Sequence, residues 1–477
     1  MTQKPALAAE PALVRGTEHP GLAGALATPF WTHDSGLAPL PASAAPLPER
    51  CDLAIVGGGF TGLWTAIEAR RRHPDWRIVV IERDFCGWGA SGRNGGFCAP
   101  SISHGPSVAK QRWPREAETL VRLGRDNLDQ LQADLERLGI DAEFERCGKL
   151  TVAQFPWQRE GLRAAARTCA AFGIETMALE GDALREKLVS PLFEAGLFEP
   201  NYAVLNPAKL VAGLRDTALS QGVEICEGLA VSAIRTGEAV VLETEAGALR
   251  CARVALATNV AKPLLRRLAG AVIPVYDYAI VTRPLSADEL ASIGWLGRYG
   301  VADAGNRFHY ARKTRDNRIL WGGYDAIYHF GGARDEARTQ RPVSFDLLAR
   351  QFAEAFPPLA DVPFTHAWGG VIDTSARTTF FAGLAARGRI AYAMGFTGQG
   401  VSASRFAALT MLDHLDGQST ERTRLAMLST RPVPFPPEPL RALSVALVQK
   451  LLAREDETGR RALLLRGLDR LGIGFDS

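Results

Sequence analysis

The sequence lacks the features of a secreted or membrane-spanning protein. Its seven cysteines are scattered over 477 residues and form no Cys-x-x-Cys pair, so neither a disulfide framework nor a metal site is expected. No apolar run reaches the roughly 18 residues of a transmembrane helix. The Pro- and Ala-rich start also lacks the basic and apolar regions of a signal peptide. We therefore expect a protein of the cytoplasm.

The sequence also lacks an excess of either charge. Its 55 basic and 52 acidic residues give a net charge of +3. A nucleic-acid-binding protein usually concentrates basic residues in a patch, so we expect no nucleic-acid partner. A chain of 477 residues is too long for one compact core of ordinary size. The length therefore predicts two domains, or one domain interrupted by insertions.

What the sequence does contain is α/β patterning at its start, middle and end, with different material between. Amphipathic helices are expected mainly over 106–200, and strands dominate 271–325. This order predicts an α/β fold in which a discontinuous Rossmann-like domain carries an α+β cap domain with a mainly antiparallel sheet. The Pro-rich start is interpreted as an arm packed on the surface, or as partly disordered. The expected divisions are an arm at 1–49, the Rossmann-like domain at 50–105, 201–262 and 367–425, the substrate-binding cap at 106–200 and 263–366, and a helical tail at 426–477.

A glycine fingerprint follows the first predicted strand. In "GGGFTG", Gly57, Gly59 and Gly62 have the Gly-x-Gly-x-x-Gly spacing that allows a tight turn, close approach of a pyrophosphate and close packing of helix on strand. A helix is expected to begin here and to point its amides at the phosphates. Glu82 ends the next strand, where a carboxylate accepts hydrogen bonds from ribose hydroxyls. The unit predicts dinucleotide binding and leaves NAD and FAD equally open.

Two further stretches favour FAD. "GWGASGRNGG" at 87–96 and "GFTGQGVSAS" at 395–404 follow the fingerprint in this order. Together the three stretches resemble the cofactor loops of the D-amino-acid oxidase–type FAD-dependent oxidoreductases, a superfamily with sarcosine and glycine oxidases. The segments "NPAKL", "WGGYD" and "HAWGG" are similar to its γ-glutamylputrescine oxidase branch. An NAD-only Rossmann dehydrogenase would not need the second and third loops.

The resemblance implies a Rossmann-like domain of the glutathione-reductase type that holds FAD. The second loop crosses the pyrophosphate, where Ser91 and Arg93 can bind phosphate. The third loop opens a helix whose N-terminus stabilises negative charge on the reduced ring. Val231 is placed near the adenine. The expected cofactor residues are Gly57, Gly59, Phe60, Thr61, Gly62, Glu82, Arg83, Gly89, Ala90, Ser91, Arg93, Asn94, Gly95, Gly96, Val231, Thr258, Asn259, Gly395, Thr397, Gly398, Gln399, Gly400 and Val401.

The resemblance also directs attention to four candidate residues of a substrate pocket. His104 follows the second loop, and Tyr278 lies on a strand of the sheet that roofs the flavin. Trp321 is expected to be a cavity wall. Strand alternation places Phe308, Tyr310 and Arg312 on one face, and Arg312 is a hypothetical clamp for an acidic group of the substrate. Packing roles for His104 and Tyr278, and a solvated charge for Arg312, are the alternatives.

The implied reaction is oxidation of a small amine by hydride transfer to non-covalent FAD, followed by hydrolysis of the imine. The sarcosine oxidase type attaches flavin through a late cysteine, but this sequence has none after Cys251. A lysine that promotes reaction with oxygen in such relatives aligns by eye with Leu320. The electron acceptor is therefore left open between O₂ and a carrier. A hydroxy-acid dehydrogenase and a flavin-binding subunit without turnover are the alternatives, and the oligomeric state stays open.

Overall fold

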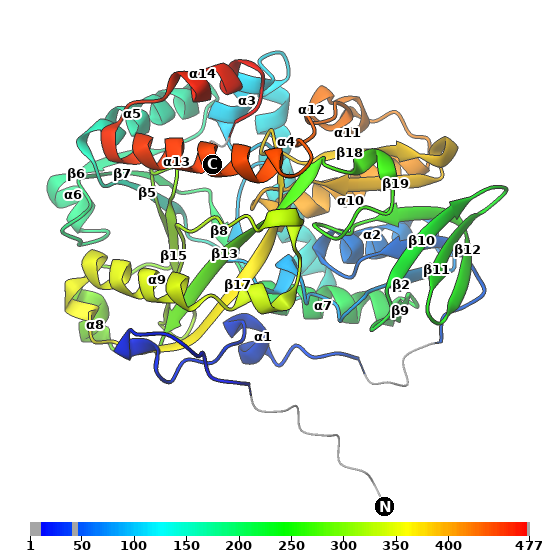
Figure 1. Ribbon diagram of the computed structural model, residues 1–477, viewed down its shortest axis with the longest axis horizontal. Helices are drawn as coiled ribbons and strands as arrows, with labels where there is room; N and C mark the ends of the chain where they lie inside the picture. Colours follow the sequence, from blue (N-terminus) through cyan, green and yellow to red (C-terminus); the bar gives the residue numbers. More distant parts are fainter. Residues whose placement is uncertain (1–10, 41–45, 475–477) are drawn as a thin grey trace, which may run out of the picture.

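The computed structural model describes residues 11–40 and 46–474, which form two large sheets with helices around them (Figure 1). The first sheet has the strand order β10-β11-β12-β1-β2-β9, with β19 beside the second half of β12 and β18 beside β19. Neighbouring strands are parallel in the part of the sheet with the order β19-β12-β1-β2-β9. Their bounds are β1 Arg50–Val56, β2 Ile78–Ile81, β9 Glu224–Cys226, β10 Val231–Thr236, β11 Val240–Thr244, β12 Gly247–Leu256, β18 Phe381–Ala385 and β19 Ile390–Met394.

Three helices bury apolar faces against this sheet. They are α2 (Phe60–Arg72), α7 (Pro207–Ser220) and α10 (Gly400–Leu415). The parallel strands read as nearly continuous apolar runs because both of their faces are covered. The sequence of β1, "DLAIV", shows this pattern, and its strand–helix–strand unit is present as expected.

The second sheet has the order β17-β13-β16-β15-β14-β5-β7-β6. Only the β14–β5 pair is parallel, so the sheet is mainly antiparallel, as the sequence predicted. Its two longest strands, β13 and β17, cross the middle of the molecule (Figure 1). The bounds are β5 Lys149–Ala153, β6 Met177–Glu180, β7 Ala195–Glu199, β13 Val272–Thr282, β14 Gly300–Asp303, β15 His309–Lys313, β16 Ile319–Gly323 and β17 Phe364–Ser375.

Two expectations about the organisation differ from the structure. Residues 106–200 are mainly helical, as expected, but this stretch also supplies β5, β6 and β7, which complete the second sheet. Helix α4 (Ala117–Leu138) from this stretch instead packs on α10, with Leu128 and Leu131 in the core of the first unit. The expected boundary at 367 falls inside β17, which pairs with β13 over its whole length in the second sheet. Long strands that pass between two units give no break in sequence pattern.

The described part of the arm, 11–40 and 46–49, is packed rather than merely laid on the surface. Phe30 and Trp31 of α1 (Phe30–Ser35) are 3% and 1% exposed. The Trp31 ring nitrogen donates to the Asn94 carbonyl at 2.9 Å, and Leu26 bridges to His366 of β17. The arm therefore packs against the second cofactor stretch, at Asn94. Part of the expected arm, 1–10 and 41–45, lies outside the described residues.

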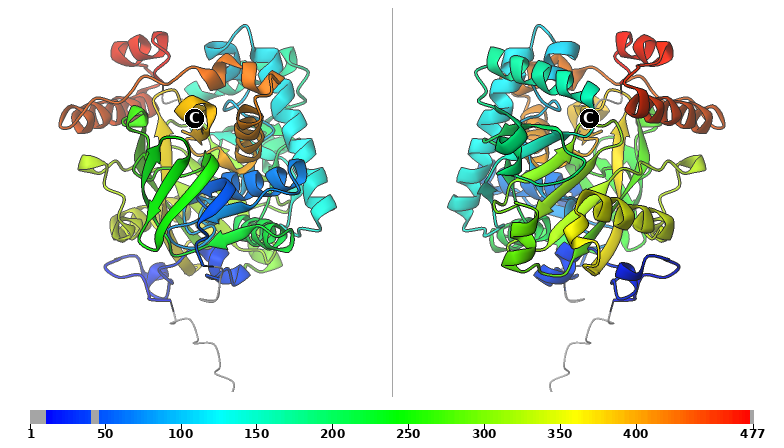
Figure 2. Two further views of the ribbon diagram at one scale, coloured as in Figure 1. Left: turned by 90° about the vertical axis from the view of Figure 1, so that its right-hand side faces the viewer. Right: turned by 90° about the vertical axis from the view of Figure 1, so that its left-hand side faces the viewer.

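The tail is helical, as expected, and lies at the opposite end of the molecule from the arm (Figure 2). Helices α13 (Leu440–Thr458) and α14 (Leu463–Arg470) pack on each other through Val448, Leu452 and Leu465. The Asp456 carboxylate accepts hydrogen bonds from the backbone N–H groups of Asn306 and Arg307 at 2.7 and 3.0 Å, which ties the tail to the second sheet.

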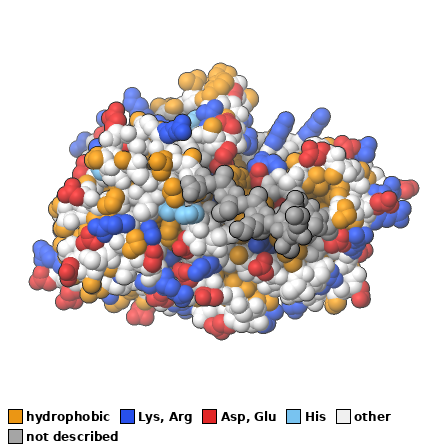
Figure 3. Space-filling model, turned by 90° about the horizontal axis from the view of Figure 1, so that it is seen from below, with side chains coloured by type: hydrophobic (Ala, Val, Ile, Leu, Met, Phe, Trp, Pro, Cys, Tyr) orange, Lys and Arg blue, Asp and Glu red, His pale blue; other side chains and the backbone are white. Residues whose placement is uncertain are grey.

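The remaining elements are short or peripheral. A small sheet, β3-β8-β4, joins the two units. On the face seen from the arm side, Lys and Arg side chains are interspersed with Asp and Glu (Figure 3). No helix within the described ranges is long and apolar enough to cross a membrane.

The bounds of the remaining helices and strands are β3 Phe97–Cys98, β4 Glu145–Arg146, β8 Ala203–Val204, α3 Pro106–Arg112, α5 Pro156–Ala171, α6 Gly181–Arg185, α8 Ala287–Ser292, α9 Pro342–Ala355, α11 Glu421–Arg424 and α12 Ala426–Ser429.

Candidate active site

A cavity of about 880 Å³ lies between the two sheets. On one side it is lined by the segments that follow β1, β2, β12 and β19. Because these strands are parallel, their carboxyl ends meet at one edge of the sheet, which is where α/β proteins bind nucleotides. On the other side it is lined by β13, β15 and β17 of the second sheet. The cavity therefore lies between the edge of the first sheet where a nucleotide would bind, here called the cofactor edge, and the face formed by β13, β15 and β17, here called the substrate wall.

The glycine fingerprint forms a backbone cradle at this edge. Gly57 has φ +111°, and a Cβ there would lie 2.4 Å from the Ala257 carbonyl oxygen. A Cβ on Gly62 would lie only 1.9 Å from the Gly57 carbonyl oxygen. Helix α2 begins directly after Gly59, so its first amides face the cavity. The cradle thus requires glycine and presents the positive end of a helix to a phosphate.

Glu82 lies at the end of β2 and lines the cavity. One carboxylate oxygen accepts the Gly58 N–H at 2.7 Å and the other accepts the Asp84 N–H at 3.0 Å. Desolvation by burial raises the pKa of this carboxyl despite these two hydrogen bonds. Each oxygen keeps a second lone pair, so the ribose contact that the sequence predicted is compatible with this geometry.

We expect Glu82→Ala to weaken FAD binding by about 1–3 kcal/mol, the scale of a hydrogen bond to a charged group. The measurement is the FAD dissociation constant by equilibrium dialysis, and Glu82→Gln serves as the partial replacement. An unchanged constant in both variants would show that this carboxylate does not contact the cofactor.

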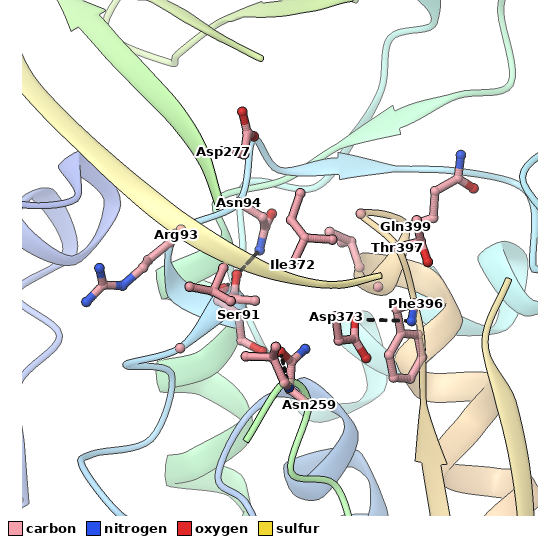
Figure 4. A pocket seen from close by; sticks show the side chains of 18 of the residues that line it. Ser91, Arg93, Asn94, Asn259, Asp277, Ile372, Asp373, Phe396, Thr397 and Gln399 are labelled. Carbon is pink, nitrogen blue, oxygen red and sulfur yellow. Dashed lines mark hydrogen bonds between the residues drawn. The ribbon is translucent and has the colours of Figure 1, made fainter. Parts of the chain in front are cut away.

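The second cofactor stretch is held in shape mainly by its own side chains. Ser91 Oγ accepts the Phe60 N–H at 3.0 Å and so joins this loop to α2. The Asn94 amide donates to the Ala90 and Ser91 carbonyls, and in Figure 4 Asn94 lies beside Ser91. The Asn94 side-chain oxygen accepts the Gly96 N–H. These contacts fix the backbone amides that line the cavity.

Arg93, which is expected to bind phosphate, also contacts neighbouring parts of the protein. Its guanidinium donates to the Trp88 and Gly369 carbonyls, lies 4.4 Å from the Trp88 ring centroid, and pairs with Glu336 at 2.8 Å. In Figure 4 it points away from Ser91 and Asn94. Arg93 lines the cavity, and its contact with the Gly369 carbonyl joins the loop to the second sheet. Its Nη2 lies 2.8 Å from Glu336 but makes no hydrogen bond with the described residues, so phosphate binding by Arg93 stays a prediction.

The third cofactor stretch is shaped by Asp373 at the end of β17. Its carboxylate accepts the Gly395 N–H at 2.6 Å and the Phe396 N–H at 3.1 Å (Figure 4). Burial raises the pKa of Asp373 to about 7, although these amide hydrogen bonds oppose the shift. Helix α10 begins within this stretch, at Gly400, and buried Gln399 Oε1 has no hydrogen-bond partner among the described residues. The stretch therefore offers a helix N-terminus and an unused acceptor to a ligand.

Most of the expected cofactor residues lie around the cavity. Gly62, Gly96 and Gly395 do not line it, because each one shapes the backbone behind the lining residues. The residues that the structure brings to the cavity are Gly57, Gly59, Phe60, Thr61, Glu82, Arg83, Gly89, Ala90, Ser91, Arg93, Asn94, Gly95, Val231, Thr258, Asn259, Thr397, Gly398, Gln399, Gly400 and Val401.

Two of the four substrate-pocket candidates line the cavity. Tyr278 does so, while its hydroxyl donates to the Arg338 carbonyl at 2.9 Å. His104 faces the cavity, with Nε2 3.4 Å from the Phe396 carbonyl oxygen and Nδ1 without a partner among the described residues. Burial lowers the pKa of His104 to about 4, so its imidazole is neutral at pH 7. A neutral ring can donate or accept one hydrogen bond there.

The structure does not place Arg312 or Trp321 in the cavity. Arg312 shares a strand face with Tyr310, but the cavity ends between them, because Trp31 and the Gly96 and Leu205 carbonyls occupy the space around its guanidinium. Arg312 is fully buried, so it is not a solvated surface charge either. Trp321 stacks on His309 inside the core of the second sheet, with ring centroids 4.6 Å apart.

Leu320 and the nearby cations Arg318 and Lys313 lie outside the cavity. Leu320 packs in a core and does not line the cavity. Arg318 pairs with Asp316, and Lys313 donates to the Trp295 and Leu296 carbonyls, so neither faces the cavity. The cationic residues that do line it are Arg83, Arg93, Lys149, Lys262 and Arg334.

Several lining residues were missed by sequence reasoning. Asp277 and Tyr310 line the wall formed by the second sheet, and their side chains are hydrogen-bonded at 2.8 Å. Asp277 lies between two tyrosines in "PVYDYAIV", so an acidic residue inside an otherwise apolar strand was the available signal. For Asp373, in "GGVIDTS", the same signal was present.

The site and fold define a flavin-dependent oxidoreductase. The sequence profile of the family described as "FAD dependent oxidoreductase" matches residues 52–413, and the chain belongs to this DAO family. It is 28% identical over 389 residues to the γ-glutamylputrescine oxidoreductase of Escherichia coli, covering 80% of this chain and 88% of that protein. The sarcosine oxidase subunit beta of Rhodobacter capsulatus is 22% identical, over 69% of this chain and 76% of its own.

A solved structure shows the same fold. Glycine oxidase from Geobacillus kaustophilus superposes with a TM-score of 0.69 at 20% identity, over 81% of this chain and all of that one. The cofactor is FAD, as the resemblance predicted. The residues present fit it, since the cradle that a Cβ would fill and the residue with the unpartnered Gln399 oxygen line one continuous cavity.

We expect FAD to be released intact when the protein is denatured with acid. None of the seven cysteines lines the cavity, and all are free thiols. Cys98, beside the second cofactor stretch, is fully buried in β3. After denaturation and filtration, the flavin absorbance should appear in the filtrate. Colour retained on the polypeptide would contradict non-covalent binding and direct attention to His104 as the attachment point.

Proposed function

We propose that this protein oxidises a small amine at the carbon next to nitrogen, giving an imine that hydrolyses in water. The observation that carries the proposal is the cavity itself, which joins the FAD edge of the first sheet to a wall of the second sheet that bears Asp277 and Tyr310. The similar γ-glutamylputrescine oxidoreductase and sarcosine oxidase subunit are named for amine substrates, which supports the same class here.

Bound FAD supplies an acceptor for a hydride equivalent. The chain's residues contribute position and exclusion of water. The amides that begin α2 and α10 face the cavity from two directions, and Trp368 and Phe396 add apolar walls. An amine must be neutral to give its lone pair to the reaction. The neutral His104 imidazole adds no positive charge that would oppose a cationic substrate entering the cavity.

The electron acceptor is proposed to be O₂, with H₂O₂ as product, or a carrier. Lys149 and Lys262 are the lysines that line the cavity among the described residues, so they are the positions to test for reaction with oxygen. The seven unpaired thiols support a reducing compartment, which we propose to be the cytoplasm.

The experiment is an anaerobic titration of the flavin-loaded protein with amines and with their hydroxy analogues. Bleaching of the flavin absorbance by an amine, and not by the matching alcohol or hydroxy acid, supports the proposal. Bleaching by a hydroxy acid alone would assign a dehydrogenase of another class, and no bleaching by any compound would favour a flavin-binding subunit without turnover. Admitting air, or a quinone, to the bleached protein then identifies the acceptor.

A further inference from the structure

An acidic side chain without a cationic partner lies in the wall of the cavity. Asp277 of β13 lines the cavity, and no Lys, Arg or His nitrogen in the described part of the chain lies within 4.0 Å of its carboxylate. Asp277 is only partly exposed and belongs to the lining of the cavity between the two sheets. A carboxylate in such a place is unfavourable unless it is protonated or a cation joins it.

The carboxylate is held in a fixed position. Its Oδ2 accepts the Tyr310 hydroxyl at 2.8 Å, and its Oδ1 accepts the Tyr278 N–H at 2.8 Å. Tyr310 itself cannot turn away, because its ring is packed between the backbones of Gly95 and Gly322. A Cβ on these glycines would lie 2.9 and 2.7 Å from the ring. The site is therefore pre-formed and attached to the second cofactor stretch through Gly95.

The carboxylate also faces the cofactor side of the second sheet. Asp277 is paired directly with Gly370 of β17, and directly paired residues present their side chains on the same face. A Cβ on Gly370 would lie 3.6 Å from the Arg93 Cβ, so this face is turned toward the second cofactor stretch. The glycine leaves open space beside Asp277. In Figure 4 Asp277 lies at the top of the labelled group and Asn259, on the nucleotide side, at the bottom.

The charged groups around Asp277 favour its ionised form only in part. Burial has the largest effect and raises the pKa of Asp277. Hydrogen bonds from the Tyr310 hydroxyl and from the Tyr278 and Gly323 amides lower it, and the charge of Asp325 raises it. The resulting pKa is about 6. The guanidinium of Arg93 is already engaged by Glu336 and two carbonyls. At pH 7 and above, the carboxylate is thus mainly charged and lacks a counter-ion of its own.

From this geometry we infer that Asp277, oriented by Tyr310, binds a second, non-reacting ammonium group of the substrate, which makes the substrate a diamine. The inference rests on the proposed amine oxidation and deepens it. An ammonium paired with a carboxylate keeps its proton, so it is not the nitrogen that gives its lone pair to the reaction. The reacting nitrogen is the other one, at the flavin end of the cavity. No acidic group of the substrate is required, in keeping with the position of Arg312 outside the cavity.

The test compares straight-chain diamines with the monoamines of equal length that lack the distal nitrogen. For each, the dissociation constant is measured by perturbation of the flavin spectrum and by calorimetry, and the rate of anaerobic flavin reduction is measured separately. In the unaltered protein the diamine should bind more tightly. Asp277→Asn should weaken diamine binding by about thirtyfold or more, the effect of removing one partner of a desolvated ion pair, and should leave the monoamine within about threefold.

Two further variants keep the result interpretable. Tyr310→Phe retains the carboxylate and removes its hydroxyl donor, so it should lower the preference for the diamine by about tenfold. Asp335→Asn is the matched control. The Asp335 carboxylate is 56% exposed and paired with Arg338 outside the cavity, so its loss should change the dissociation constant of neither the diamine nor the monoamine. FAD content and thermal midpoint are compared for all variants.

The outcomes separate the inference from the proposed function. Equal losses for diamine and monoamine, or no preference for the diamine in the unaltered protein, would overturn the role of Asp277. Tight diamine binding that depends on Asp277, with no flavin reduction by any amine, would overturn amine oxidation while leaving the cation site standing.

Discussion

Gly62→Val should abolish FAD binding. The Cβ alone would lie 1.9 Å from the Gly57 carbonyl oxygen and 3.3 Å from a side-chain carbon of Ile55, and valine adds two methyl groups to it. The start of α2 must therefore move away from β1, which separates the helix amides from the cradle. Because the carbonyl belongs to rigid backbone, no side-chain rotation relieves the contact. We expect the FAD dissociation constant to rise by about a hundredfold or more.

A second helical glycine provides the control. Gly467 of α14 is exposed, and a Cβ there would meet nothing within 4 Å, so Gly467→Val tests the same substitution without the contact. FAD binding is measured by flavin fluorescence quenching and by the flavin-to-protein ratio after purification. Circular dichroism of the FAD-free proteins reports folding. Normal FAD content in a folded Gly62→Val protein would remove the fingerprint from the cofactor site.

The cofactor edge was predictable because its chemistry is local. Gly57, Gly62 and Glu82 belong to one strand–helix–strand unit, and the close approach of Gly62 to Gly57 involves residues only five positions apart. Spacing along the chain determines such contacts. The later stretches at 87–96 and 395–404 reach the same edge because they, too, follow parallel strands of one sheet.

The substrate wall was less predictable because it depends on where long strands are covered. Alternation correctly put Tyr310 and Arg312 on one face of β15, yet the arm residue Trp31 closes the cavity between them. No local pattern in β15 reports the position of an arm almost 280 residues earlier. For the same reason the short strands within 145–199 were not anticipated. Strand β5 pairs with β14 and β4 pairs with β8, and these partners are distant in sequence.

Single acidic residues were missed for another reason. Asp277 and Asp373 each stand in a strand among apolar and small residues, and neither belongs to a spaced motif. Their roles follow from partners on other elements: Tyr310 for Asp277, and the amides of 395–396 for Asp373. A buried carboxylate in a strand is a useful signal of a site, but only the fold shows what it contacts.

Asp373 should make the stability of the protein depend on pH near neutrality. Its side chain is 1% exposed and has no ion pair within the described residues, and burial raises its pKa to about 7. In an unfolded chain an aspartate titrates near pH 4. Between about pH 4 and pH 7 the folded protein thus binds more protons than the unfolded chain at this residue. The stability that it contributes is fully present below pH 4 and is lost as the pH rises through 7.

The size of this effect follows from the same linkage. One proton bound only in the folded state changes the free energy of unfolding by about 1.4 kcal/mol per pH unit, so Asp373 accounts for a loss of up to about 4 kcal/mol across its window. Asp277 and Glu82, whose pKa values are also raised, contribute slopes of the same sign. Asp373→Asn removes only the first contribution. Its amide oxygen can accept one of the Gly395 and Phe396 N–H groups, which bond to different oxygens of Asp373, and the loss of the other bond lowers stability equally at every pH.

The measurement is therefore a difference between two proteins. Urea unfolding of the FAD-free wild type and of Asp373→Asn is followed at several pH values from 5 to 8, and the two free energies are subtracted at each pH. We expect the wild type to lose stability relative to the variant as the pH rises to about 7, with no further relative change above pH 8. The same comparison with FAD bound shows whether the cofactor alters the titration. Parallel curves in the FAD-free proteins would mean that Asp373 is ionised throughout, and that the amides of the third cofactor stretch fully compensate its burial.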